Sequence, residues 1–93
     1  MKKASYKVED GKMVKIELDV QDETVEEVRI RGDFFLQPPE KLGTLESSLQ
    51  ELNVDSTVDE VAAKLEPVDA DLIGFSHRDI GKAFRKAVEG EEK

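Results

Sequence analysis

The 93-residue chain contains no cysteine, no tryptophan and a single histidine, His77. The absence of cysteine excludes disulfides, thiolate zinc sites and cysteine nucleophiles, and one histidine excludes a metal site with several histidine ligands. No apolar run approaches the ~18 residues of a membrane-spanning helix, and the N-terminal stretch MKKASYKVED lacks the apolar segment of a signal peptide. We therefore expect a cytoplasmic protein that does not enter a membrane.

Sequence signals for catalysis are also missing. Neither GxxxxGK[ST] nor GxGxxG occurs, so no phosphate-binding loop is predicted. The acidic residues are numerous, but none forms a spaced pair in an apolar setting, and a solvent-exposed side chain is the more common case for a histidine at a helix start, where His77 lies. The sequence therefore predicts no catalytic residue, no cofactor-binding residue and no metal ligand on this chain.

Positive charge is scarce. The chain has 22 acidic and 14 basic residues, a formal net charge of -8, which disfavours a primary role on DNA, RNA or an anionic membrane. Residues 40–71 hold nine acids and two bases, so most of the excess lies there. This segment is either a solvated helical surface or a docking surface for a basic partner.

The N-terminal third alternates apolar and polar residues with the period of β-strands. The first apolar set is Ala4, Tyr6 and Val8, and the second is Val14, Ile16, Leu18 and Val20. The intervening residues 9–11 end in Gly11, which fits a three-residue bulged turn with a left-handed glycine. A third strand is predicted from Val28, Ile30 and Phe34.

The pairing of the second and third predicted strands can be chosen by charge. Placing Val20 opposite Val28 sets Asp19 against Arg29, Glu17 against Arg31 and Lys15 against Asp33. A shift of two residues would instead place Lys15 against Arg31 and Asp19 against Glu27. Because like charges directly opposite each other destabilise a sheet, we predict the first register.

Helical patterns follow Pro38 and Pro39. Leu42, Leu45, Leu49 and Leu52 form one apolar stripe, and Thr57 with Glu60 forms a capping box for a helix that ends at Pro67. A third helix starts at Ser76 with Asp79 as its capping partner and Phe75 stapled to Ile80, and it closes at Gly90. Its predicted apolar face is Ile80, Ala83, Phe84, Ala87 and Val88.

These elements predict one α+β domain, residues 1–93. Its three-stranded antiparallel sheet, about residues 3–35, has about three helices, within residues 39–90, packed on one face. In the predicted register Phe34 points inward, whereas Phe35 points outward or leaves the strand. Phe34 therefore has a structural explanation and Phe35 has none, which leaves two interpretations: both are core residues, or Phe35 contacts a partner.

Several stretches together resemble a known family. The sequence GDFFLQPPE follows the strand VEEVRIR, the hairpin YKVEDGKMVKIELDV precedes it, and LIGFSHRDIGKAF lies near the end. In this order they resemble the C-terminal accessory domain of lipoate-protein ligases, and more narrowly the archaeal bipartite form, in which that domain is a separate small subunit. The resemblance spans about Tyr6 to Val88.

The resemblance implies a function. Such ligases activate lipoate with ATP to lipoyl-AMP and transfer the lipoyl group to a lysine of an acceptor domain, with ATP, Mg²⁺ and lipoate held by the large catalytic subunit. This chain would then be a noncatalytic but required subunit of a heterodimer, and Asp33, Phe35 and Phe75 would lie at the partner interface. The alternative is a free-standing acidic interaction module of the same fold. In both cases neither nucleic acid nor a membrane is an expected partner.

Overall fold

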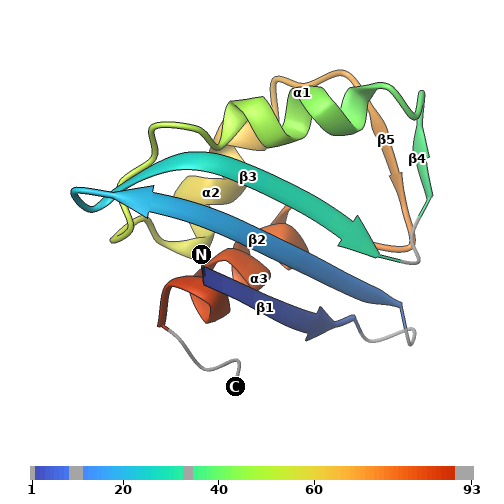
Figure 1. Ribbon diagram of the computed structural model, residues 1–93. Coiled ribbons are helices and arrows are strands. Elements are labelled where there is room, and N and C mark those ends of the chain that lie inside the picture. The colour runs from blue at the N-terminus through green and yellow to red at the C-terminus, as the bar shows by residue number, and fades with distance from the viewer. Residues whose placement is uncertain (1, 9–11, 33–34, 90–93) are drawn as a thin grey trace.

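The computed structural model describes residues 2–8, 12–32 and 35–89, and for Phe35 only the backbone (Figure 1). The described chain forms five strands and three helices in an α+β arrangement. Their bounds are β1 Lys2–Lys7, β2 Met13–Gln21, β3 Thr24–Gly32, β4 Phe35–Gln37, α1 Lys41–Ser48, α2 Val58–Leu65, β5 Asp71–Ile73 and α3 His77–Glu89. The predicted fold class is confirmed, and β4 with β5 is an addition to it.

The first two strands form the predicted hairpin. Ala4 pairs with Ile16 and Tyr6 with Val14 in antiparallel register, so the apolar sets of both strands share one face. The N–H of Val8 donates to the carbonyl of Lys12 at 2.8 Å, which closes the ladder before the turn. The predicted left-handed glycine of this turn, Gly11, lies outside the described residues.

The predicted register of β2 and β3 is wrong. The strands pair two residues away from it, with Lys15 opposite Arg31 and Asp19 opposite Glu27, so that like charges face each other at two positions. Three charge pairs were expected in the predicted register. Glu17 faces Arg29 instead of Arg31, and Asp19 faces Glu27 instead of Arg29. Asp33, the predicted partner of Lys15, lies outside the described residues.

Burial explains why the charge argument failed. The observed register extends the ladder to Thr24, with a bulge between Asp19 and Val20, and brings Val25 into the core with no exposed surface. Burying a valine contributes about 1.5–3 kcal/mol, whereas an exposed cross-strand ion pair contributes about 0.2–1 kcal/mol. Asp22 and Glu23 form the connecting two-residue turn with φ of 54° and 65°, the combination that a type I′ turn requires.

Hydrogen bonds from other parts of the chain occupy backbone groups at both edges of this sheet. At the β3 edge the N–H of Ile30 donates to the Glu46 carboxylate at 2.8 Å, and at the β1 edge the Lys86 ammonium donates to the Ser5 carbonyl at 2.9 Å. The N–H of Val25 also donates to the carbonyl of Leu52. Because unpaired strand edges invite pairing with other chains, these contacts reduce aggregation through the sheet.

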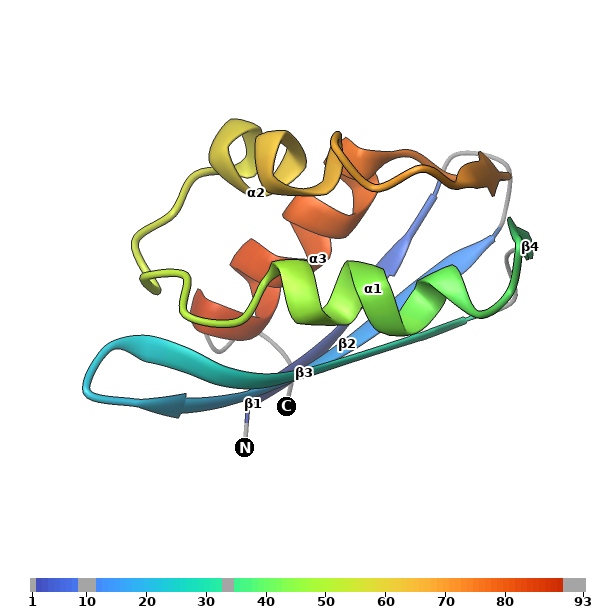
Figure 2. The same ribbon diagram turned by 90° about the horizontal axis from the view of Figure 1, so that it is seen from above.

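All three helices lie on one side of the sheet, as predicted (Figure 2). Helix α3 packs over β1 and β2, α1 packs over β3, and α2 packs mainly on α3. None of the described helices covers the opposite face of the sheet, which carries the charged side chains. The result is a two-layer arrangement with the core between the layers.

Helix ends agree with the sequence signals. The capping box of Thr57 and Glu60 is present, with hydrogen bonds of 2.8 and 3.1 Å, and α2 ends before Pro67. The N–H of Ser76 donates to the Asp79 carboxylate at 2.8 Å at the start of α3. Helix α1 is shorter than its leucine stripe, because Leu49 is its C-cap and Leu52 lies beyond it. The predicted end of α3 at Gly90 lies outside the described residues.

The core contains apolar residues that were predicted from the strand alternation and from the helical spacing of the sequence. Phe84, Leu45, Leu49 and Leu65 have no exposed surface, and neither do Val14, Ile16, Leu18 and Ile30. Phe34, which was predicted to point into the core, lies outside the described residues.

Candidate partner interface

Strands β4 and β5 form a separate two-stranded ribbon at one end of the molecule (Figure 1). Phe35 pairs with Ile73, Leu36 with Leu72 and Gln37 with Asp71, all antiparallel. The sequence predicts a third strand that runs through residue 35. In the structure β3 ends at Gly32, and the chain enters this second sheet at Phe35.

One side of the ribbon joins the core and the other does not. Leu36 is 9% exposed, and Leu72 packs against the core cluster. Ile73 is 45% exposed, the exposed large hydrophobic residue of the described chain. Because successive residues of a strand point to opposite faces, Leu72 and Ile73 cannot both face the core.

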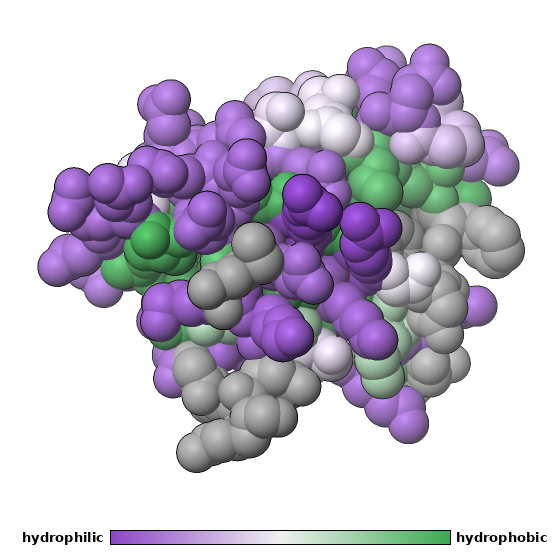
Figure 3. Space-filling model, viewed as in Figure 1, coloured by the Kyte–Doolittle hydropathy of each residue, from purple (hydrophilic) through white to green (hydrophobic). Residues whose placement is uncertain are grey.

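The ribbon also has unpaired strand edges. Within the described residues β4 pairs only with β5, so each strand has one edge without a neighbouring strand. At this end of the molecule Figure 3 shows hydrophobic surface next to hydrophilic surface, and a second hydrophobic area lies at the opposite end. An exposed isoleucine next to free strand edges is a feature of surfaces that bind another chain.

A glycine positions this ribbon relative to α3. Gly74 follows β5 with φ of +92°, a conformation that residues with a side chain rarely adopt, and the aliphatic stem of Lys12 would lie 3.4 Å from any β-carbon there. The chain then reaches Phe75 and the Ser76 cap of α3. Ile73 is therefore followed directly by the Gly74 turn and the capped start of α3.

Two of the three predicted interface residues, Phe35 and Phe75, lie in or next to the ribbon. Asp33 lies outside the described residues. The backbone of Phe35 is the partner of Ile73 in the ribbon, so the position predicted for partner contact adjoins the exposed isoleucine. Phe75 is 7% exposed and belongs to the core cluster, so a partner could reach only a small part of it. The interface role of all three remains a prediction.

Ile73 was missed by the sequence analysis. The available signal was the pair Leu72–Ile73 in a short segment between Asp71 and Gly74, since a strand directs two adjacent apolar residues to opposite faces. No strand was predicted there, so neither Leu72 nor Ile73 could be assigned to a buried or an exposed face.

His77 differs in part from the expectation of a solvent-exposed side chain. The residue is half-buried, and its Nε2 atom is shielded from solvent without a hydrogen-bond partner among the described residues.

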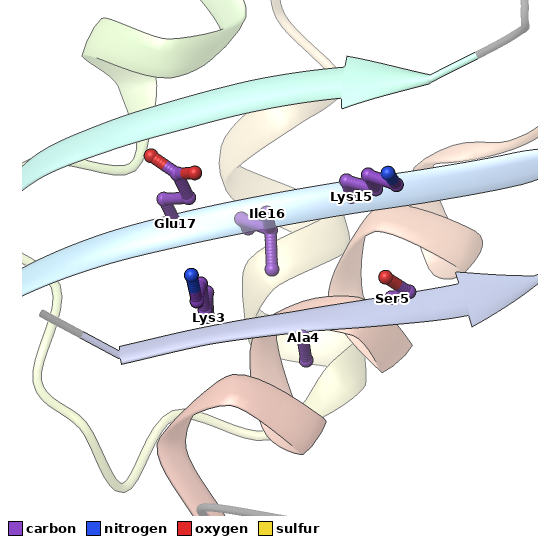
Figure 4. A pocket seen from close by; sticks show the side chains of 6 residues that line it. All are labelled: Lys3, Ala4, Ser5, Lys15, Ile16 and Glu17. Carbon is purple, nitrogen blue, oxygen red and sulfur yellow. The ribbon is translucent and has the colours of Figure 1, made fainter. Parts of the chain in front are cut away.

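The remaining described surface has few features typical of a ligand site. A hollow of about 220 Å³ over β1 and β2 is lined by Lys3, Ala4, Ser5, Lys15, Ile16 and Glu17 (Figure 4). Ligand pockets usually measure about 300–1,000 Å³. Within the described ranges no group of three or more His, Asp or Glu side chains could hold a metal ion, and none of the three helices has the length and hydrophobicity to cross a membrane.

Comparison with known proteins shows a similarity to a solved structure. No family profile matches the chain, and no curated protein does. A solved structure from Thermoplasma acidophilum is similar, described as an archaeal lipoylation system with a bipartite lipoate protein ligase and its E2 lipoyl domain. The TM-score is 0.74 at 20% identity, and the match covers 89% of this chain and 92% of the other. The resemblance stated from the sequence is therefore confirmed at the level of the fold.

Proposed function

We propose that this chain is the accessory small subunit of a bipartite lipoate-protein ligase. The observation that carries the proposal is the fold similarity to a chain of such a system, which spans nine-tenths of both chains. Independent support comes from the GDFF and LIGFS stretches, which supply the first residue of β4 and the whole of the LI pair in β5. The two stretches that carry the sequence resemblance thus meet in one ribbon.

The chemistry of the reaction belongs to the large subunit in this proposal. In this proposal the large subunit binds ATP, Mg²⁺ and lipoate. The lack of a phosphate-loop motif in the sequence and the small hollow over β1 and β2 support this assignment. The subunit would act by holding the catalytic subunit in the arrangement that forms lipoyl-AMP, before transfer to a lysine of the acceptor domain.

The contact with the large subunit is assigned to the β4–β5 ribbon. An exposed β-branched residue beside free strand edges can pack into a partner and extend its sheet. Ile73 therefore joins Asp33 and Phe35 as an interface residue, and Phe75 supports the ribbon from the core.

The test is co-expression with a candidate large subunit, a ligase-like protein that lacks this domain, followed by copurification and a lipoylation assay with ATP and lipoate. The large subunit alone should be inactive, and adding this chain should restore lipoylation. Ile73→Lys should abolish copurification, whereas Ala63→Lys, which adds the same charge at an exposed position of α2, should not. Full activity of the large subunit without this chain would refute the proposal.

The alternative is a free-standing interaction module that shares the fold. The excess of nine acids over two bases in residues 40–71 supports it, since such a surface attracts basic partners. This alternative predicts no effect of the chain on lipoylation, so the same assay separates the two functions.

A further inference from the structure

The open face of the three-stranded sheet carries a cluster of positive charge on an otherwise acidic molecule. Four exposed cations, Lys3, Lys15, Arg29 and Arg31, lie next to Glu17, and we call these five residues the sheet-face patch. The row beyond Glu17 holds the acidic pair Asp19 and Glu27. The net charge of the patch is +3 (four cations, one carboxylate), whereas the whole chain carries -8. Figure 4 shows the side chains of Lys3 and Glu17 beside each other on β1 and β2, with Lys15 farther along β2 opposite Ser5.

The strand registers fix how these charges lie. Lys3, Glu17 and Arg29 form one row across the sheet, and Lys15 and Arg31 lie opposite each other in the next. Strands are about 4.8 Å apart, and alternate residues along a strand are about 6.8 Å apart, so all five charges fall within one contact area. Among the described residues none of the five has an ion-pair partner.

The Lys15–Arg31 pair is unfavourable for the isolated chain. Like charges directly opposite each other destabilise an antiparallel pair, and in the described chain Glu17, two residues from Lys15 on β2, forms no ion pair with either of them. A charge arrangement that weakens the free protein can strengthen a complex, because natural proteins give up stability at binding sites.

We propose that the sheet-face patch docks an acidic surface of another protein. A compact anion would meet only the flexible ends of lysine and arginine here, because the strand backbones pair with each other and the hollow measures about 220 Å³. A nucleic acid would place phosphates against Glu17 at the centre of the patch and has no basic group to pair with it. A protein surface can present carboxylates to the four cations and one basic group to Glu17.

The rest of the molecule makes this docking selective for one orientation. Repulsion between an acidic partner and the acidic segment 40–71 disfavours approach to that side, whereas contacts in the patch act within the Debye length of about 8–10 Å. This inference goes beyond the proposed ligase role and does not depend on it, because it concerns the sheet face rather than the β4–β5 ribbon.

The experiment is an NMR titration of the full chain with a synthetic glutamate-rich peptide at low salt. The expected result is amide shifts confined to β1, β2 and β3, which diminish as salt is added. Arg31→Glu should weaken binding about tenfold or more, and Lys64→Glu, the same charge change on exposed α2, should leave it unchanged within about twofold. Arg31→Glu should at the same time raise the melting temperature, since the introduced carboxylate would face Lys15, so loss of binding cannot be attributed to unfolding.

Four outcomes would overturn the proposal. The first two are no binding at low salt and an equal loss in both variants, which would reflect net charge alone. Shifts on the same strands with inorganic triphosphate as strong as those with the peptide would indicate a small-anion site. Concentration-dependent sedimentation that Arg31→Glu abolishes would identify a second copy of this chain as the occupant.

Discussion

Arginine residues in this small domain have unequal roles, depending on what their guanidinium groups contact. Arg85 donates to the carbonyls of Val54 and Ser56 at 2.6 and 2.9 Å and so fastens the segment before α2 to α3. Ser56 is buried, so its carbonyl would lose a partner that water does not easily replace. Arg78 instead pairs with Asp59 where both side chains are largely exposed.

This difference predicts unequal losses of stability. Arg85→Met should lower the free energy of unfolding by about 2 kcal/mol, because two hydrogen bonds from a charged donor disappear. Arg78→Met should cost at most about 1 kcal/mol, the usual contribution of an exposed ion pair. Urea denaturation of both variants checks this, and equal losses would show that the 54–56 segment does not depend on Arg85.

At the scale of elements, the approach of α2 to α3 depends on one glycine. A β-carbon at Gly81 would lie 2.8 Å from the carbonyl oxygen of Val58 and 3.1 Å from its Cγ1, so any side chain there forces the helices apart. At Gly43 in α1 a β-carbon would meet nothing within 4 Å. The two glycines are therefore a matched pair within helices.

We expect opposite effects from the same substitution. Gly43→Ala should stabilise the protein by up to about 1 kcal/mol through helix propensity. Gly81→Ala gains the same propensity, but overpacking costs about 1–3 kcal/mol, so the net effect should be destabilising. Thermal unfolding measures both, at about 4–8 °C per kcal/mol for a domain of this size. A rise in melting temperature with Gly81→Ala would mean that the helices separate without loss.

The elements that could be predicted from the sequence are those with a strong local signal. The two capping sequences of α2 and α3 and the alternation in β1 and β2 depend on neighbours in the chain, and each was predicted correctly. The β2–β3 register was predicted from exposed charge pairs. The prediction was wrong because burying Val25 contributes more stability than those charge pairs do. The ribbon of β4 and β5 joins segments more than thirty residues apart, so no local sequence pattern predicts this pairing.

The same limit applies to the candidate interface. The GDFF stretch indicated a surface role for Phe35 because two adjacent phenylalanines in a strand cannot both face the core. Ile73 becomes visible as its neighbour only once the tertiary pairing is known. Sequence therefore located one strand of the candidate interface, and the structure supplied the other.

At the scale of the whole molecule, the proposed ligase role separates two half-reactions. If the subunit holds the catalytic subunit in an adenylation-competent arrangement, disrupting the β4–β5 ribbon surface should prevent formation of lipoyl-AMP from ATP and lipoate. Transfer from lipoyl-AMP supplied ready-made should be spared, because the resemblance assigns the lysine-transfer site to the large subunit.

The variants for this test are Ile73→Lys and the double variant Asp33→Ala with Phe35→Ala. Ile73 contributes little to its own core at 45% exposure, so Ile73→Lys should leave the circular dichroism spectrum unchanged. Buried apolar anchors often carry a large share of binding energy, and we expect a loss of at least about 2 kcal/mol of binding, about thirtyfold in the concentration needed for half-maximal adenylation. Adding excess subunit should then restore the rate, which an unfolded variant could not do. Equal loss in both half-reactions would place this subunit in the transfer step as well, and no loss in either would move the interface away from the ribbon.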